Sequence, residues 1–121
     1  MDARRDVGLA GERIACVYLR RHGYTIVHAP WRHLPHGEID IVARHKGELV
    51  FVEVKTRRDN EFGYPEVAVT HAKRKKINML IDLYFQAHKL PIRPHRFDVI
   101  AVEYGAPEPK ITHIEAVGVD G

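Results

Sequence analysis

The sequence contains very little cysteine and no long hydrophobic run. Cys16 is the single cysteine, which excludes an internal disulfide and a cysteine-based zinc cluster and favours a reducing compartment. No apolar stretch approaches the roughly 20 residues needed to cross a bilayer. Residues 1–6 are charged with no apolar segment behind them, so no secretory signal is predicted. We therefore expect a soluble, cytoplasmic protein with no membrane partner.

The composition indicates one folded domain. Hydrophobic residues make up 45% of the chain and charged residues 29%, an ordinary globular balance. A chain of 121 residues can enclose one hydrophobic core but not two, so we predict a single domain spanning residues 1–121. The net charge is +3, and basic residues gather in short clusters at residues 4–5, 20–22, 55–58 and 73–76. Such clusters suit a phosphate backbone, and solvated surface faces are the alternative interpretation.

Hydrophobic periodicity predicts the order α-β-β-β-α-β-β, an α/β fold with a mixed central sheet flanked by helices. Strands are expected at residues 24–29, 38–44, 48–56, 97–103 and 110–116, with a polar loop at 57–65. The first helix, residues 7–22, is expected to bury Val7, Ala10, Ile14, Val17 and Tyr18. The second, from the N-cap Thr70 to about residue 88, is expected to bury Ile77, Leu80, Ile81 and Tyr84.

Acidic and basic residues alternate with aliphatic residues on the predicted hairpin. A two-residue turn at residues 46–47 would place Asp40 directly opposite Glu53, and Glu38 opposite Lys55. Opposed residues have Cβ atoms about 4.5–5.5 Å apart, so the two carboxylates could share one cation. Without a cation, like charges placed this way destabilise a hairpin. A bound metal is the simplest explanation of the pair, and an exposed cross-strand charge network is the alternative.

This residue set is suited to phosphodiester hydrolysis. Carboxylate oxygens favour Mg²⁺ or Mn²⁺, which take one or two carboxylates together with water and substrate phosphate. Lys55 is expected on the same side of its strand as Glu53. There it can orient an attacking water or stabilise charge developing on a phosphate. A metal that activates water and neutralises the transition state completes this chemistry.

Helical spacing brings two further charged residues toward the same place. Glu12 lies beside Gly8 and Ala15, at the border of the apolar face of the first helix, where it can face the polar site or reach solvent. Lys73 lies four residues before Ile77 in the first turn of the second helix. It can point inward toward a phosphate or extend along the surface.

The chain contains five short motifs in this order: Gly11-Glu12, Gly-Glu-Ile-Asp at 37–40, Phe-Val-Glu-Val-Lys-Thr-Arg at 51–57, Val69-Thr70 with Lys73, and Arg96-Phe97-Asp98-Val99. Together they resemble the bacterial YraN (UPF0102) family over roughly residues 6–118. That family is similar to archaeal Holliday-junction resolvases within the PD-(D/E)xK nuclease superfamily. The resemblance implies a restriction-endonuclease-like core, with Ile39 in place of the superfamily's proline.

The resemblance also implies roles for individual residues. Asp40, Glu53 and the carbonyl of Val54 would hold Mg²⁺ or Mn²⁺. Glu12 would assist, and Lys55 would position the nucleophile. From the hairpin register, Glu38 would hold Lys55 in place across the ladder. Three basic residues would contact nucleic acid: Arg57, Arg58 and Lys73.

The function expected from these roles is a metal-dependent endonuclease acting on branched or otherwise structured DNA. Resolution of a symmetric junction needs two active sites, so a C2 homodimer would follow for that substrate. Two alternatives remain: a nuclease for RNA or single strands, and a non-catalytic nucleic-acid-binding module on a nuclease fold. Asp98 lies among apolar neighbours and is expected to be a hydrogen-bonded partner of Arg96 rather than a catalytic residue.

Overall fold

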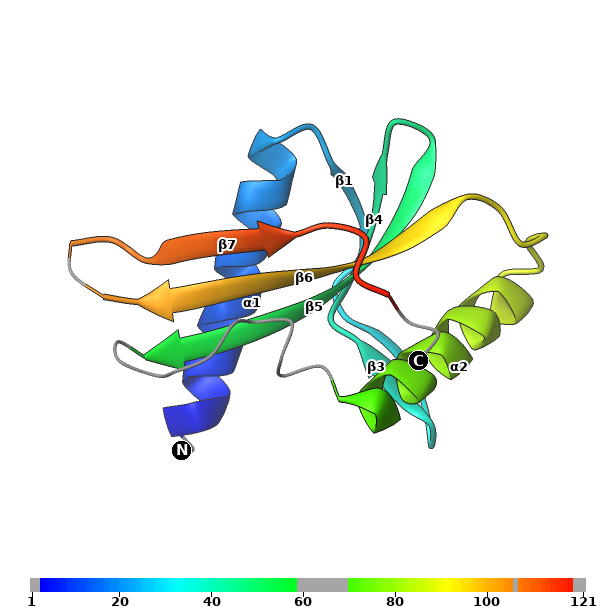
Figure 1. Ribbon diagram of the computed structural model, residues 1–121, viewed down its shortest axis with the longest axis horizontal. Helices are drawn as coiled ribbons and strands as arrows, with labels where there is room; N and C mark the ends of the chain where they lie inside the picture. Colours follow the sequence, from blue (N-terminus) through cyan, green and yellow to red (C-terminus); the bar gives the residue numbers. More distant parts are fainter. Residues whose placement is uncertain (1–2, 59–69, 106, 119–121) are drawn as a thin grey trace.

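The fold is a mixed sheet with one helix on each face, shown in the computed structural model of Figure 1. The structure describes residues 3–58, 70–105 and 107–118, and their side chains from residue 8 onward with the exception of residue 58. Five strands form the sheet in the order β1-β4-β5-β6-β7. Their bounds are β1 Thr25–His28, β4 Ile41–His45, β5 Glu48–Arg58, β6 His95–Tyr104 and β7 Lys110–Ile114. Only β5 and β6 run parallel; the other neighbours are antiparallel.

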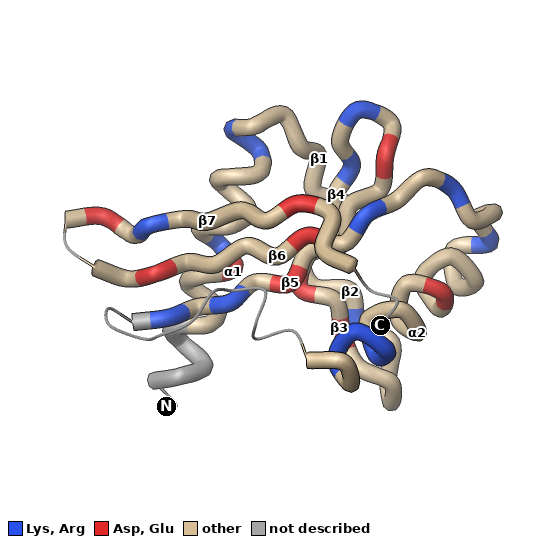
Figure 2. The backbone as a smooth tube through the Cα atoms, viewed as in Figure 1, with Lys and Arg blue, Asp and Glu red and all other residues tan. Residues whose placement is uncertain are grey.

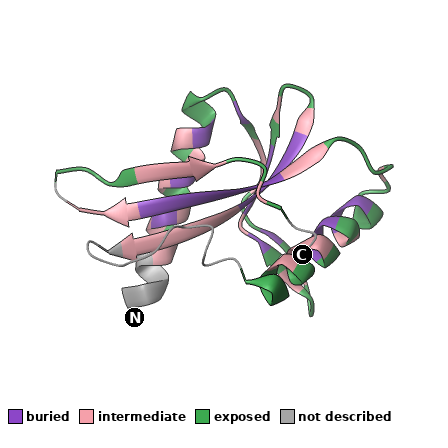
Figure 3. Cartoon of the chain, in the orientation of Figure 1, coloured by how far each residue is buried: buried purple, intermediate pink, exposed green. Residues whose placement is uncertain are grey.

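The two helices pack against opposite faces of this sheet. Helix α1 (Ala3–Arg21) and helix α2 (His71–Ala87) each join a separate buried cluster. Successive side chains of β5 point to opposite faces of the sheet. Phe51 therefore lies in the cluster with α2, whereas Val50 and Val52 lie in the cluster with α1. Figure 3 shows the interior strand β6 buried along most of its length. The predicted α/β class and mixed sheet are therefore confirmed, in agreement with a restriction-endonuclease-like core.

The predicted hairpin forms with the predicted turn. Lys46 and Gly47 have φ values of 49° and 78°, as a two-residue type I′ turn requires. Strands β4 and β5 then pair from His45↔Glu48 to Ile41↔Val52. The ladder stops there, because the chain bends at Asp40 and the preceding residues leave the main sheet. The prediction of one continuous strand over 38–44 was wrong at this bend.

A small second hairpin accounts for the bend. Strand β2 (Trp31–His33) pairs with β3 (Gly37–Ile39), a two-stranded sheet that sequence periodicity did not predict. Its apolar residues Trp31 and Ile39 are buried in the α2 cluster, where the Trp31 ring meets Tyr84 edge-on at 5.1 Å. The hydrophobic contact with α2, rather than the main sheet, therefore fixes the direction of the chain before Asp40.

The buried face of α1 differs from the predicted one. Ala15 and Leu19 are fully buried and Gly11 is buried with them, whereas Val17 is 45% exposed. Ile14 and Tyr18 are only partly buried, and the side chain of Val7 lies outside the described residues. The buried face includes the small residues Gly11 and Ala15, which allow the helix to approach the sheet closely. A ranking of residues by hydrophobicity does not predict this. Glu12 lies next to this face and is partly buried.

Helix α2 matches its prediction closely. Thr70 is the N-cap, and its hydroxyl accepts a hydrogen bond from the Lys73 backbone N–H at 3.2 Å. The helix buries Leu80, Ile81, Tyr84 and also Phe85, with Ile77 partly buried. The predicted loop at 57–65 begins later than expected, since β5 continues to Arg58, and residues 59–65 lie outside the described residues. Neither helix, within the described ranges, is long and apolar enough to cross a membrane.

Asp98 is a structural residue, as predicted. It is fully buried and accepts hydrogen bonds from Arg96 Nε at 3.0 Å, His113 Nε2 at 2.7 Å and the Ala116 backbone N–H at 3.0 Å. Burial alone would raise the pKa of Asp98, but the hydrogen bonds from His113 and Arg96 outweigh it and lower the pKa. Arg96 also binds Glu48 at 3.0 Å, so this network joins β5, β6 and β7 at one end of the sheet.

Candidate functional site

The site forms where strand β5 continues beyond the end of β4. From Glu53 onward, β5 has β6 on one side and no paired strand on the other among the described residues. Asp40 lies at this open edge, and its Oδ2 accepts a hydrogen bond from the Val54 N–H at 2.8 Å. The N–H and C=O of one strand residue point toward the same neighbour. The carbonyl of Val54 therefore also faces the open edge beside Asp40.

Glu53 brings a second carboxylate to this edge, with an incomplete set of partners. Its Oε1 lies 3.7 Å from Lys55 Nζ and 3.8 Å from Lys73 Nζ. Its Oε2 is buried and has no hydrogen-bond partner among the described residues. A buried carboxylate oxygen without a partner is costly, so this atom is a fitting ligand for a cation.

Asp40 is surrounded by other carboxylates. Burial raises the pKa of Asp40 to about 7; the hydrogen bond from Val54 opposes the rise, and the charges of Glu12, Glu53 and Glu38 add to it. Glu12 has a raised pKa as well, from burial first and then from Glu38. The predicted cross-strand pair of Asp40 and Glu53 does not form, because the ladder ends at Ile41 and Val52, but the charges of Glu12 and Glu53 still act on Asp40. A divalent cation would relieve the repulsion among these groups.

A cavity of about 350 Å³ opens in front of the two carboxylates. Asp40 and Glu53 line it from the sheet, and Lys73 and Lys76 line it from α2. Figure 2 shows basic residues gathered toward the end of β5 and in the first turns of α2. Sequence reasoning missed Lys76, even though its spacing of three residues from Lys73 puts the two on one helix face. The cavity therefore has an acidic wall and a basic wall.

Glu38 does not have its predicted partner. It pairs with Arg32 across the β2–β3 hairpin, and its Oε2 accepts from Arg32 Nε at 2.8 Å. The prediction that Glu38 faces Lys55 was wrong, because the bend at Asp40 removes residues 37–39 from the β4–β5 ladder. Glu38 still lines the cavity and contributes negative charge near Asp40 and Glu12.

The remaining predicted residues lie along the same strand. Arg57 is partly buried near the end of β5, and Arg58 is the last residue of β5, with a side chain outside the described residues. No group of three or more His, Cys, Asp or Glu side chains in the described ranges is arranged to hold a metal ion. A cation at Asp40 and Glu53 would therefore need further oxygen ligands from the Val54 carbonyl, water or a substrate phosphate, a shell typical of Mg²⁺.

Helix α1 reaches the site because Gly11 allows a close approach. A Cβ atom at Gly11 would lie 2.2 Å from Thr56 Oγ1 and 3.3 Å from its Cβ. We expect Gly11→Ala to lower the free energy of unfolding by about 1–3 kcal/mol, the usual cost of overpacking. Because Glu12 is the next residue, the shifted helix also moves that carboxylate away from Asp40. Urea denaturation measures the loss of stability.

The control for Gly11 lies one turn earlier on the same helix. A Cβ atom at Gly8 meets nothing within 4 Å, so Gly8→Ala should stabilise the helix by up to about 1 kcal/mol. Adding Thr56→Ala to Gly11→Ala should recover most of the lost stability, since it removes the clashing hydroxyl. If Gly11→Ala proves as stable as Gly8→Ala, the close approach does not position the helix.

A mixed five-stranded sheet with a helix on each face is an α/β architecture that is consistent with a restriction-endonuclease-like core. Residues 11–102 match the model of "Uncharacterised protein family UPF0102". UPF0102 proteins of Roseiflexus castenholzii and Syntrophotalea carbinolica are each 46% identical to this chain. The first alignment covers 92% of this chain and 91% of the relative, and the second covers 98% and 96%. The chain belongs to the UPF0102 family.

Proposed function

We propose that this protein is a metal-dependent endonuclease that hydrolyses phosphodiester bonds in branched or structured DNA. The observation that carries the proposal is the buried Oε2 of Glu53, which has no hydrogen-bond partner among the described residues. The other oxygen of this carboxylate, Oε1, lies 3.7 Å from Lys55 Nζ and 3.8 Å from Lys73 Nζ, and Asp40 lines the same cavity. The resemblance to Holliday-junction resolvases supports the choice of substrate. A binding module without catalysis has no need for clustered carboxylates where phosphates would approach.

Each residue of the site has a distinct task in this proposal. Asp40, Glu53 and the Val54 carbonyl would hold Mg²⁺ or Mn²⁺, which when bound supplies water activation and charge neutralisation. Lys55 would place its ammonium group next to the reacting phosphate and stabilise charge that develops there. Glu12 would bind a water of the metal shell. Lys73 and Lys76, on the opposite wall of the cavity, would bind the phosphate backbone.

Burial lowers the pKa of Lys55, and Lys73 lowers it further. The charge of Glu53 opposes this fall in the pKa. A substrate phosphate between Lys55 and Lys73 would stabilise the charged form of both lysines. A phosphate bound by the basic wall could thus also contact a cation held by the acidic wall.

The proposal is tested by incubating the protein with labelled linear, flapped and four-way DNA molecules in Mg²⁺, Mn²⁺ or EDTA. We expect cleavage of the branched molecules in either metal and none in EDTA. RNA and single-stranded DNA in the same panel test the other nuclease classes. Binding to junctions with no cleavage in either metal would instead support the non-catalytic binding module.

The affinity for DNA should fall steeply with salt. If Lys73, Lys76 and Arg57 each displace a counterion, affinity should drop at least about tenfold between ~50 and ~200 mM salt. Fluorescence anisotropy with a labelled four-way junction measures this slope. An affinity that stays constant over the same range would mean that these basic residues are solvated and do not contact phosphate.

A further inference from the structure

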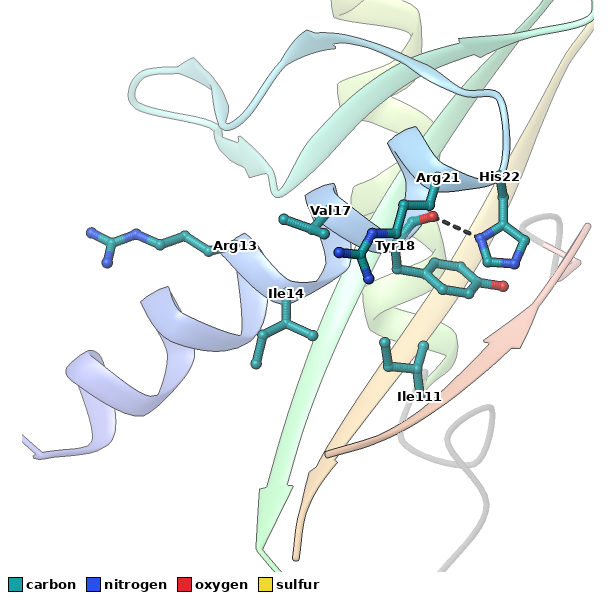
Figure 4. Close-up of a pocket in the computed structure, with 7 residues that line it drawn as sticks. All are labelled: Arg13, Ile14, Val17, Tyr18, Arg21, His22 and Ile111. Carbon is teal, nitrogen blue, oxygen red and sulfur yellow. Dashed lines mark hydrogen bonds between the residues drawn. The ribbon is translucent and has the colours of Figure 1, made fainter. Parts of the chain in front are cut away.

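A second cavity lies on the far side of α1, away from the carboxylates. It measures about 360 Å³ and sits between α1 and the edge strand β7. Its lining residues are Arg13, Ile14, Val17, Tyr18, Arg21, His22 and Ile111. None of these lines the cavity at Asp40 and Glu53, so the two surfaces are separate. Figure 4 shows Ile14 and Tyr18 of α1 and Ile111 of β7 around this space.

The walls of this groove are held by hydrogen bonds and ring contacts. Tyr18 donates its hydroxyl proton to His113 Nδ1 at 3.1 Å, and His113 Nε2 is bound to the buried Asp98 at 2.7 Å. His22 Nδ1 donates to the Tyr18 carbonyl at 2.8 Å, and the two rings lie 4.2 Å apart. The pocket is therefore preformed, and an occupant would not need to order it.

The floor of the groove is apolar and its rim is cationic. Ile14, Tyr18 and Ile111 are partly buried, and Val17 is 45% exposed. No lining residue is acidic, and neither Arg13 nor Arg21 forms an ion pair with any described residue. In Figure 4 the Arg21 side chain reaches over the apolar side chains, whereas Arg13 extends outward. A matching ligand carries a bulky apolar group next to negative charge.

We propose that this groove binds an acidic peptide segment of a partner protein, with one large aliphatic or aromatic side chain of that segment seated in the pocket. Strand β7 is an edge of the sheet, so one side of its backbone has no strand partner among the described residues. Those N–H and C=O groups can pair with a peptide backbone but not with a nucleic acid backbone in the same way. A peptide is therefore favoured over a nucleic acid.

A second copy of this chain is a poorer occupant. A twofold interface brings the same patch of each copy together. The arginines of one copy would then meet the arginines of the other, and Lys110 at the start of β7 adds to this repulsion. The cationic rim requires an acidic partner surface, and the same groove of a second copy is not acidic.

The test is fluorescence anisotropy with a labelled ten-residue peptide of Asp and Glu that carries one central Leu. We expect saturable binding, a loss of at least tenfold when the Leu is replaced by Ser, and a similar loss for Arg21→Glu and Val17→Ser. Arg93→Glu, an exposed arginine before β6, is the matched control and should bind normally. Circular dichroism of each variant separates lost binding from lost folding.

Three results would overturn the proposal. Equal binding of the Leu and Ser peptides would mean that the pocket is not used. A single-stranded oligonucleotide that binds more tightly than the peptide, with the same dependence on Arg21, would assign the groove to nucleic acid. Sedimentation of the protein without peptide gives the third. If the protein is a dimer and Val17→Ser dissociates it, the occupant of the groove is a second copy of the chain. Asp40→Asn should leave peptide binding intact, so this test is independent of the proposed nuclease activity.

Discussion

Lys55→Ala is expected to lower the rate of cleavage of a four-way junction at least about 100-fold while leaving the affinity for the junction nearly unchanged. The reason is that Lys55 acts on charge present mainly in the transition state, so its loss affects rate rather than binding. Removal of one such electrostatic contact typically costs about 10²–10³ in rate. Single-turnover cleavage with excess protein measures the rate, and anisotropy in Ca²⁺ or EDTA measures the affinity.

The matched control is Lys75→Ala, because Lys75 is exposed on α2 and does not line the cavity. We expect it to cleave at the rate of the unmodified protein. Lys73→Ala should weaken DNA binding, since Lys73 lies on the basic wall and contacts Glu53 only at 3.8 Å. A Lys55→Ala protein that cuts at an undiminished rate would refute the catalytic role of Lys55, even if the protein proves to be a nuclease.

Asp40→Asn is expected to abolish cleavage and, in EDTA, to stabilise the folded protein at alkaline pH. Burial raises the pKa of Asp40 to about 7 in the folded state, against an ordinary value of 3.8. The folded state therefore binds the proton of Asp40 more tightly than the unfolded state does. The stability that this protonation contributes is lost as the pH rises from about 4 to about 7. Between pH 5 and 8 this amounts to about 2–3 kcal/mol at roughly 1.4 kcal/mol per pKa unit.

The difference between the two proteins isolates the contribution of Asp40, because every other ionisable group is common to both. Urea denaturation at pH 5 and pH 8 measures the free energy of unfolding of both proteins. Relative to the unmodified protein, Asp40→Asn should become more stable as the pH rises. Asp82→Asn, on the exposed face of α2, should show no such gain. Parallel pH profiles for the unmodified protein and Asp40→Asn would mean that Asp40 has an ordinary pKa and no unfavourable charge to relieve.

Local rules of chain geometry predicted much of the site. Lys46-Gly47 needs positive φ at both positions and so fixed the register of β4 and β5. Strand alternation then placed Glu53 and Lys55 on one face. The N-cap preference of Thr70 fixed the start of α2 and with it the place of Lys73. Each of these features depends on a few neighbouring residues, which a sequence displays directly.

The features that were missed depend on contacts between distant residues. The bend at Asp40 follows from the burial of Trp31 and Ile39 in the cluster of α2, far along the chain, where Trp31 meets Tyr84. The close approach of α1 follows from the fit of Gly11 against Thr56. The cost of leaving Glu53 Oε2 without a partner becomes visible only when the packing around it is known. Such features give the candidate metal site its burial, and periodicity carries no information about them.

The most direct test of the proposed metal site is a calorimetric titration of the metal-free protein with Mn²⁺. We predict one weak binding event in the unmodified protein that becomes tighter with DNA present, because substrate phosphate completes the shell. Asp40→Asn and Glu53→Gln should each remove it, while Asp82→Asn should retain it. An isotherm that is the same for the unmodified protein and for Asp40→Asn would contradict a metal held by these two carboxylates, and with it the proposed mechanism of cleavage.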